Sequence, residues 1–214
     1  MLGFIGGTGP EGRGLALRFA LAGEKVLIGS RNEERARQAA ESVLELAPPG
    51  SVRGAINSDV AKEADIVFIA VPYTAQRDTL NDLKEQLSGK LVINLIAPIE
   101  FNKGRASAII VEEGSAALES QAILAESTIV AAFQNVSAED LLVPEKSIDS
   151  DVIVCADDAE AKERVMKMVE MIKGARAVNG GGLANARYVE NLTALLVTIN
   201  RIYKAHSSIK ITGI

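Results

Sequence analysis

The sequence has almost none of the residues on which zinc sites and stacking sites depend. Its 214 residues include one cysteine, Cys155, and one histidine, His206, which excludes a Cys/His zinc cluster. A lone cysteine cannot form an intrachain disulfide and suits a reducing compartment. Aromatic residues amount to 4% with no tryptophan, so a base-stacking platform has little support. We expect no metal site, and we expect His206 on the surface.

Basic charge is also in short supply. Lys and Arg number 23 against 28 Asp and Glu, a net charge of −5, which argues against nucleic acid as a partner. The chain opens on an apolar run with no basic residues before it, so no targeting signal is evident. The apolar run 192–199, flanked by Glu190 and Arg201, is too short to span a bilayer. We therefore expect a cytoplasmic protein with no membrane partner.

The N-terminal half alternates short apolar runs with stretches of helical period. The runs lie at 2–5, 25–28, 52–56, 66–71 and 91–95. Between the second and third runs, Ala36, Ala39, Ala40 and Val43 recur with the spacing of one helix face. Strands that are apolar throughout and separated by amphipathic helices are typical of a parallel sheet covered on both faces. The sequence predicts an α/β fold, a Rossmann-type doubly wound parallel sheet.

The pattern is less regular after Pro98. We expect a loop over 99–113, a helix over 115–125, strands at 129–133 and 152–155, and a last helix over 183–204. Asp157 and Asp158 resemble a helix cap, favoured by the helix dipole; the alternative is a pair of metal ligands. A boundary near residue 140 divides the chain into a main domain, 1–140, and a small C-terminal helical or α+β unit, 141–214.

A glycine-rich loop follows the first apolar run directly. Gly7, Gly9 and Gly12 form the pattern G-x-G-x-x-G, in which the glycines serve a tight turn, approach of a pyrophosphate and close helix packing. The helix that begins there offers free N–H groups and a positive dipole end to phosphates. Because the loop lies between a strand and a helix, it predicts a dinucleotide site rather than a structural turn. The residues between the glycines are Thr8, Pro10 and Glu11.

The end of the second run indicates which dinucleotide binds. An NAD site places an acidic residue there for the ribose hydroxyl, but this chain reads Gly29, Ser30, Arg31, with Arg35 one helical turn on. The two arginines can bracket a 2′-phosphate, and the Ser30 hydroxyl can add a hydrogen bond. The alternative is a solvated pair matched to Glu33 and Glu34. NADP(H) is the favoured cofactor, which makes 1–140 an NADP-binding domain.

The ends of the fourth and fifth runs point to the nicotinamide. Val71 and Tyr73 flank Pro72 where the fourth run ends, at the sheet edge where ligands of this architecture bind. Tyr73 can lie beside the nicotinamide ring or serve only in packing. Ala97 before Pro98 repeats the arrangement with a small side chain, which leaves room for a flat ring or reflects packing alone.

No residue is placed to act as a proton donor. A Tyr-x-x-x-Lys pair is absent, and Arg187 with Asn191 stands where β-hydroxyacid dehydrogenases carry Lys and Asn. Arginine stays protonated and is a poor proton shuttle. Direct hydride transfer between two bound cofactors needs only stacked rings in reactive geometry. We therefore expect catalysis by positioning, with no catalytic acid or base.

Four motifs along the chain carry a resemblance: 6–18 (GGTGPEGRGLALR), Gly29-Ser30-Arg31, 151–158 (DVIVCADD) and 183–193 (LANARYVENLT). Together they resemble the NADPH-dependent coenzyme F-420 reductases (F-420 is also written F420). The resemblance implies reversible hydride transfer between C5 of the 5-deazaflavin and C4 of the nicotinamide, with NADP(H) as cofactor and coenzyme F-420 as co-substrate. By this resemblance Thr8 to Glu11, Ser30, Arg31 and Arg35 bind NADP, Tyr73, Ala97 and Ala138 line the nicotinamide end, and Ser207 contacts the deazaflavin.

The chain departs from some members at Gln134, which replaces a histidine near the deazaflavin ring and can still hydrogen-bond. The acidic balance offers no obvious cationic cradle for the anionic tail of F-420, which we expect in solvent. A reductase of a flavin, imine or ferric chelate, or a non-catalytic NADP(H) sensor, are the alternatives.

The last predicted helix carries an apolar stripe, with Leu192, Leu195, Leu196, Ile199 and Ile202 on one side. This stripe is either buried against its own domain or forms the contact of a homodimer or higher homo-oligomer. The unit 141–214 would complete the deazaflavin site and supply the oligomer contact.

Overall fold

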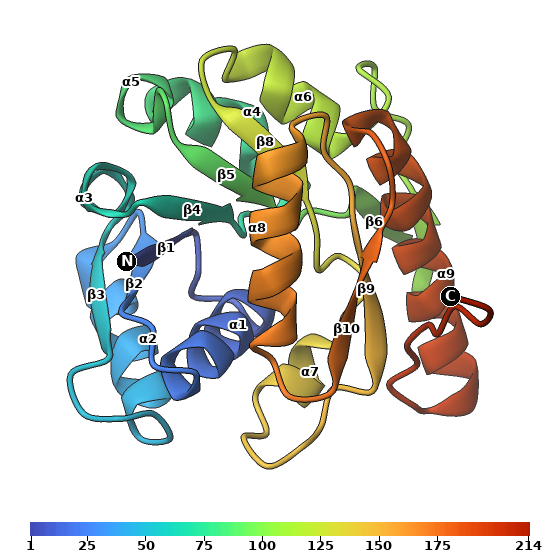
Figure 1. The fold of residues 1–214 in the computed structure, drawn as a ribbon, viewed down its shortest axis with the longest axis horizontal. Helices are drawn as coiled ribbons and strands as arrows, with labels where there is room; N and C mark the ends of the chain where they lie inside the picture. Colours follow the sequence, from blue (N-terminus) through green and yellow to red (C-terminus); the bar gives the residue numbers. More distant parts are fainter.

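The computed structural model describes all 214 residues and has a six-stranded parallel sheet at its centre (Figure 1). The strand order is β3-β2-β1-β4-β5-β8. This is the order of a doubly wound sheet, so the predicted Rossmann-type fold is confirmed. The strands are β1 (Leu2–Ile5), β2 (Val26–Ser30), β3 (Val52–Ile56), β4 (Ile66–Ile69), β5 (Leu91–Asn94) and β8 (Thr128–Ala131).

Side chains along each strand alternate between two hydrophobic cores, one on each face of the sheet. On β1, Leu2 and Phe4 belong to one core and Ile5 to the other. Residues of α1 (Pro10–Leu21), α2 (Glu33–Leu44) and α8 (Ala159–Glu170) complete the first core. The second core is completed by α3 (Asn57–Glu63), α4 (Tyr73–Asp82), α5 (Lys84–Leu87), α6 (Ala116–Ile123) and the start of α9 (Ala186–Tyr203).

The sheet reverses its direction of winding between β1 and β4. From β1 the chain leads through α1 to β2 on one side, whereas β4 pairs with the other side of β1. The loops that leave the carboxyl ends of these two strands therefore diverge and open a crevice, where ligands of doubly wound folds bind. The glycine loop 6–9 lies at this position.

The C-terminal part adds a second, smaller sheet. β9 (Ser150–Val154) pairs in parallel with β10 (Ala175–Asn179), and a single antiparallel bridge between Ala131 and Cys155 joins β9 to the end of β8. The strand β10 was not predicted, because Val178 is its only large apolar residue. Beyond α9, the chain end is held along β9: Ile209 O accepts from Asp151 N at 2.9 Å, and Asp151 Oδ2 accepts from Ile211 N at 2.6 Å.

Two local predictions meet different outcomes. The loop predicted over 99–113 is wrong, because β6 (Ile99–Asn102) and β7 (Arg105–Ala108) form an antiparallel hairpin within it. Each strand has only four residues and most are exposed, so no apolar run marks them. The cap predicted at Asp158 is confirmed, since its Oδ1 accepts from Ala161 N at 2.7 Å and α8 begins one residue later. Asp157 accepts from Leu183 N, ahead of the short 3₁₀ helix Leu183–Asn185.

The apolar stripe of α9 is largely uncovered. Leu195 is 55% and Ile202 67% exposed, Leu192 and Ile199 are half-buried, and only Leu196 is buried. Burial against its own domain therefore does not account for the stripe. None of the helices, α9 included, is both long enough and apolar enough to cross a membrane.

Candidate functional site

The glycine loop is shaped by close contacts that only glycine permits. Gly6 has φ +69°, in the left-handed region, so the tight turn lies one residue earlier than the motif predicts. A Cβ on Gly12 would lie 2.6 Å from Gly7 Cα, so α1 packs directly on the loop. A Cβ on Gly9 would meet nothing within 4 Å, which leaves the backbone there open to a ligand.

The first turn of α1 faces this open backbone. Gly9 caps the helix and Pro10 follows, so the first helical position lacks an N–H that would need a partner. The free N–H groups and the dipole of the helix end favour an anion at this point. Asn57, directly after β3, holds the glycine loop in place, because its Oδ1 accepts from Gly6 N at 3.1 Å.

A polar cleft of about 380 Å³ lies on one side of the glycine loop. Arg31 and Arg35 line it, and both are exposed and free of ion pairs. Glu34, in the helix α2, pairs with Arg37 at 2.6 Å and not with either of these arginines. The alternative of a solvated pair matched to Glu33 and Glu34 is therefore not observed. The cleft is lined by Gly6, Thr8, Ser30, Arg31, Asn32, Arg35, Asn57, Val71, Pro72, Ala75 and Thr79.

A second cavity, of about 510 Å³, lies at the first turn of α1, where Glu11 lines it. Three acceptor atoms of its lining residues are buried without a hydrogen-bond partner: Glu11 Oε1, Gln134 Oε1 and Asn135 Oδ1. Buried acceptors without partners are rare and are suited to a ligand that brings donors. The cavity is lined by Glu11, Gln134, Asn135, Val136, Ser137, Ala138, Glu139, Thr193, Leu196, Val197, Asn200, Lys204, Ala205, His206 and Ser207.

Gln134 is held in this cavity from two sides. Its side-chain Nε2 donates to Asn94 O at 3.0 Å, and its backbone carbonyl accepts from Thr193 Oγ1 at 3.0 Å. The preceding residue, Phe133, has φ +73°, a strained value for a side chain of this size. Phe133 is fully buried and packs edge-on against Phe19, and this packing sustains the strain. The strained backbone thus directs Gln134 toward the cavity.

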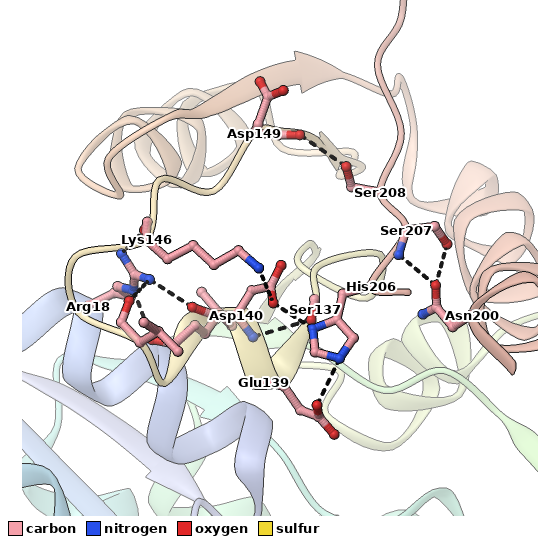
Figure 2. Close-up of polar contacts among 12 residues, drawn as sticks. Arg18, Ser137, Glu139, Asp140, Lys146, Asp149, Asn200, His206, Ser207 and Ser208 are labelled. Carbon is pink, nitrogen blue, oxygen red and sulfur yellow. Dashed lines mark hydrogen bonds and ion pairs between the residues drawn. The ribbon is translucent and has the colours of Figure 1, made fainter. Parts of the chain in front are cut away.

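The rim of the cavity is formed by the C-terminal tail and by α7 (Ala138–Leu141), as Figure 2 shows. His206 Nε2 lies 2.8 Å from Glu139 Oε2, so the side chain bridges the tail and α7 although it is 42% exposed. Ser207 donates through both its N and its Oγ to Asn200 Oδ1, at 2.5 Å each. The tail beside the cavity is therefore held to α7 through His206 and to α9 through Ser207.

The electrostatics of Glu11 set it apart from other acidic residues. Burial raises the pKa of Glu11 to about 8. The carboxyl group is therefore neutral at neutral pH, which makes its place at the anion-binding end of α1 compatible with a phosphate. The composition alone gives no sign of this shift.

The structure brings most of the predicted residues to the two hollows. Thr8, Ser30, Arg31, Arg35 and Val71 line the polar cleft, and Glu11, Gln134, Ala138 and Ser207 line the second cavity. Tyr73 and Ala97 line neither of them, and Arg187 and Asn191 are exposed outside both. Residues without a sequence-based prediction are Asn57, Asn135, Thr193 and Asn200. Asn57 and Asn135 are polar residues that follow strands, which was the available signal; Thr193 and Asn200 lie within α9 and carry no such signal.

A doubly wound sheet with a glycine loop at its crevice and an arginine-lined cleft beside it defines a dinucleotide-binding protein of the Rossmann class. A family model described as "NADP oxidoreductase coenzyme F420-dependent" matches residues 1–98. The F420-dependent NADP reductase of Methanothermobacter thermautotrophicus is 42% identical over 98% of this chain and 94% of its own length. That of Methanocaldococcus jannaschii is 37% identical over 100% of the chain and 98% of its own length. The chain belongs to the family of F420-dependent NADP reductases.

A solved structure shows the same fold over the whole length. The crystal structure of a candidate F420-dependent NADP reductase from Arthrobacter sp. FB24 has a TM-score of 0.85 and covers 99% of each chain at 24% identity. The smaller sheet of β9 and β10 and the final helix therefore belong to the common architecture.

Proposed function

We propose that the protein transfers a hydride reversibly between reduced coenzyme F-420 and NADP⁺. The observation that supports this most directly is that the glycine loop and the first turn of α1 contribute to two separate hollows: Gly6 and Thr8 line the arginine-lined cleft, and Glu11 lines the cavity of Gln134. The membership of the chain in the reductase family supports the same pair of substrates.

The NADP contacts that we propose follow from the cleft. The backbone of Gly7, Thr8, Gly9, Pro10, Glu11 and Gly12 holds the pyrophosphate at the start of α1. Arg31 and Arg35 hold the 2′-phosphate with the Ser30 hydroxyl, since neither arginine is engaged by a carboxylate. We assign Val71, Tyr73, Ala97 and Ala138 to the nicotinamide from the sequence pattern and the family resemblance; of these, Val71 lines the cleft and Ala138 the second cavity.

The deazaflavin contacts that we propose lie in the second cavity. Gln134 and Asn135 present buried acceptors to N–H or O–H groups of the ring, and Ser207 closes the cavity from the tail. The two coenzymes supply both reactive carbons; NADPH and one proton convert oxidised F-420 to its reduced form and NADP⁺. The protein contributes binding, orientation and exclusion of water, without a catalytic acid or base.

The residues 141–214 act, in this proposal, as a unit that completes the deazaflavin site and supplies an oligomer contact. Thr193, His206 and Ser207 of this part line the second cavity. On α9, Tyr188, Leu192, Leu195, Ile199 and Ile202 alternate in steps of four and three residues, the spacing of a helix–helix seam. We propose a cytoplasmic homodimer or higher homo-oligomer joined through this stripe.

The proposed activity is tested by mixing the pure protein with NADPH and oxidised F-420 and following the absorbance of the deazaflavin. Loss of the oxidised chromophore with stoichiometric formation of NADP⁺ is the expected result. No change at any pH, with the protein folded and NADPH bound, would exclude the activity. Turnover of a free flavin, an imine or a ferric chelate in place of F-420 would assign another acceptor.

A further inference from the structure

A cationic cleft lies beside the second cavity, between the hairpin and α9. Its volume is about 680 Å³, and its five lining residues are all polar: Asn102, Lys103, Arg105, Ser107 and Arg201. Three of the five are cations, in a chain with a net charge of −5. None of the three forms an ion pair, whereas Arg37, Arg53, Arg77 and Arg176 all do.

The hairpin holds these cations on one face. Lys103 and Gly104 form a two-residue turn with φ +47° and +76°, a conformation that matches the twist of the two strands. Asn102 pairs with Arg105 across the turn, so both side chains project to the same side. Arg201 of α9 completes the cluster, because its Nη1 donates to Gly104 O. Glu100 is the single acidic residue on this face, opposite Ser107, and it does not line the cleft.

The cationic cleft is continuous with the second cavity along α9. Val197 lines the second cavity and also a groove of about 580 Å³ between the hairpin and α9. Arg105 and Arg201 line this groove and the cationic cleft. Val197 and Arg201 are one helical turn apart, about 6 Å along the axis. A flexible chain that leaves the second cavity past Val197 therefore reaches the cations within a few bonds.

We propose that this cleft binds the anionic tail of the deazaflavin through its carboxylate groups. The inference rests on the proposed function, because the second cavity must hold the ring whose tail leaves it. An arginine fork matches a carboxylate with two parallel hydrogen bonds, and Arg105 and Arg201 have no competing carboxylate partner. The net charge of −5 gives no sign of this local basic site. In this proposal the tail is bound to the protein, whereas the sequence led us to expect it in solvent.

The test compares oxidised F-420 with the same 5-deazaflavin lacking the anionic tail, each with saturating NADPH. In the double variant Arg105→Gln, Arg201→Gln we expect the KM for F-420 to rise about tenfold, about threefold for each exposed ion pair lost, with kcat unchanged. The KM for the tail-less compound should not change. Salt should raise the KM of the wild type for F-420 and leave that for the tail-less compound unaltered.

One control variant and two milder variants keep the result interpretable. Arg53→Gln removes an exposed arginine that pairs with Glu63 far along the chain, and should change neither KM. If the double variant unfolds, two milder variants replace it. Lys103→Gln removes a charge from the turn without removing any hydrogen bond, and Arg201→Lys keeps the charge. An equal rise of both KM values, or no rise of either, would overturn the tail site. Turnover of neither deazaflavin by the wild type would overturn the proposed function, and the tail site with it.

Discussion

The Nδ1 atom of His206 lies 2.6 Å from Oδ1 of Asp140, and this contact joins the C-terminal tail to α7 at the rim of the second cavity (Figure 2). The other ring nitrogen, Nε2, faces Glu139, so the imidazole contacts two carboxylates of α7. Asp140 is in turn bound by Lys146 at 2.7 Å. Although burial acts to raise the pKa of Asp140, the hydrogen bonds from Lys146 and His206 hold it below its usual value.

Removing this bridge should weaken binding of the deazaflavin and leave NADPH unaffected. In His206→Gln the tail loses its two imidazole contacts with α7, so Ser207 is held less firmly at the cavity. We expect the KM for F-420 to rise about two- to fivefold, the range of an exposed ion pair, with the KM for NADPH unchanged. Lys210→Gln is the matched control. Lys210 lies in the same tail as His206 and pairs with Asp149, but it does not line the cavity. Equal effects of both variants would show that the bridge has no special role.

Arg18 should be a major determinant of stability. Its side chain is almost fully buried. The guanidinium donates to five backbone carbonyls in the second half of α7 and the loop that follows, those of Asp140, Leu141, Val143, Pro144 and Lys146. Arg18→Met would remove all five bonds; Asp140 O and Val143 O would keep backbone donors, Val143 N and Lys146 N, whereas the other three carbonyls would lose their side-chain donor. We expect urea unfolding to show a loss of about 3 kcal/mol, because several hydrogen bonds from a charged group are lost at once.

The control for Arg18 is Arg53→Met. Arg53 forms one exposed ion pair with Glu63, and its replacement should cost less than about 1 kcal/mol. Similar losses in the two variants would mean that the carbonyl cluster is satisfied by water when Arg18 is removed.

The sequence predicts the parts of this fold that bury long apolar runs. The six strands of the main sheet are recognisable because both faces are covered, so nearly every side chain in them is apolar. The hairpin β6–β7 and the strand β10 escape prediction, because few of their side chains are buried. The motif likewise indicates which glycines matter but not that Gly6 makes the turn with φ +69°, where a Cβ would also lie 2.4 Å from Val71 Cγ1, a residue 65 positions along the chain.

The candidate site divides in the same way. Arg31 and Arg35 are predictable because this part of the polar cleft is built from one strand end and one helix start, within six residues of sequence. The second cavity combines α1, the segment after β8, α9 and the tail, which are far apart in the sequence. No local pattern reports that Thr193 donates to the carbonyl of Gln134, or that Phe133 adopts a left-handed backbone.

Arg31 should decide the choice between NADPH and NADH. Arg31→Ala removes one of two cations proposed to bind the 2′-phosphate, and a charged hydrogen bond of this kind contributes about 1.5–3 kcal/mol. We expect the KM for NADPH to rise at least tenfold with the KM for NADH almost unchanged. Arg37→Ala, on the helix α2 that follows Arg31 but paired with Glu34 and Glu41, is the control. If the KM for both cofactors stayed constant, the 2′-phosphate would bind elsewhere.

Glu190 should make the fold less stable as the pH rises. Burial raises the pKa of Glu190 to about 7, although the N–H groups of Ala116 and Ala117 donate to its carboxylate and partly oppose the shift. Between the ordinary value of 4.5 and 7 the folded protein holds a proton that the unfolded chain has lost, so stability falls with pH in this window. The loss amounts to about 3 kcal/mol. The free energy of unfolding of Glu190→Gln, measured by urea titration from pH 5 to 8, should lack this component, and a parallel decline in both proteins would contradict the assignment.

Glu11 should make NADPH binding dependent on pH in the alkaline range. Its pKa of about 8 means that the free protein carries a neutral carboxyl beside the start of α1 up to that pH. A bound pyrophosphate repels the ionised form, so above pH 8 binding of NADPH must be accompanied by uptake of a proton. The dissociation constant should therefore be constant from pH 6 to about 8 and then increase by up to tenfold per pH unit. In Glu11→Gln the amide cannot ionise, and the dissociation constant measured by fluorescence titration should stay level to pH 9.5. Because the wild type and the variant differ in this one titration, identical profiles would mean that the carboxyl lies too far from the bound phosphates to affect them.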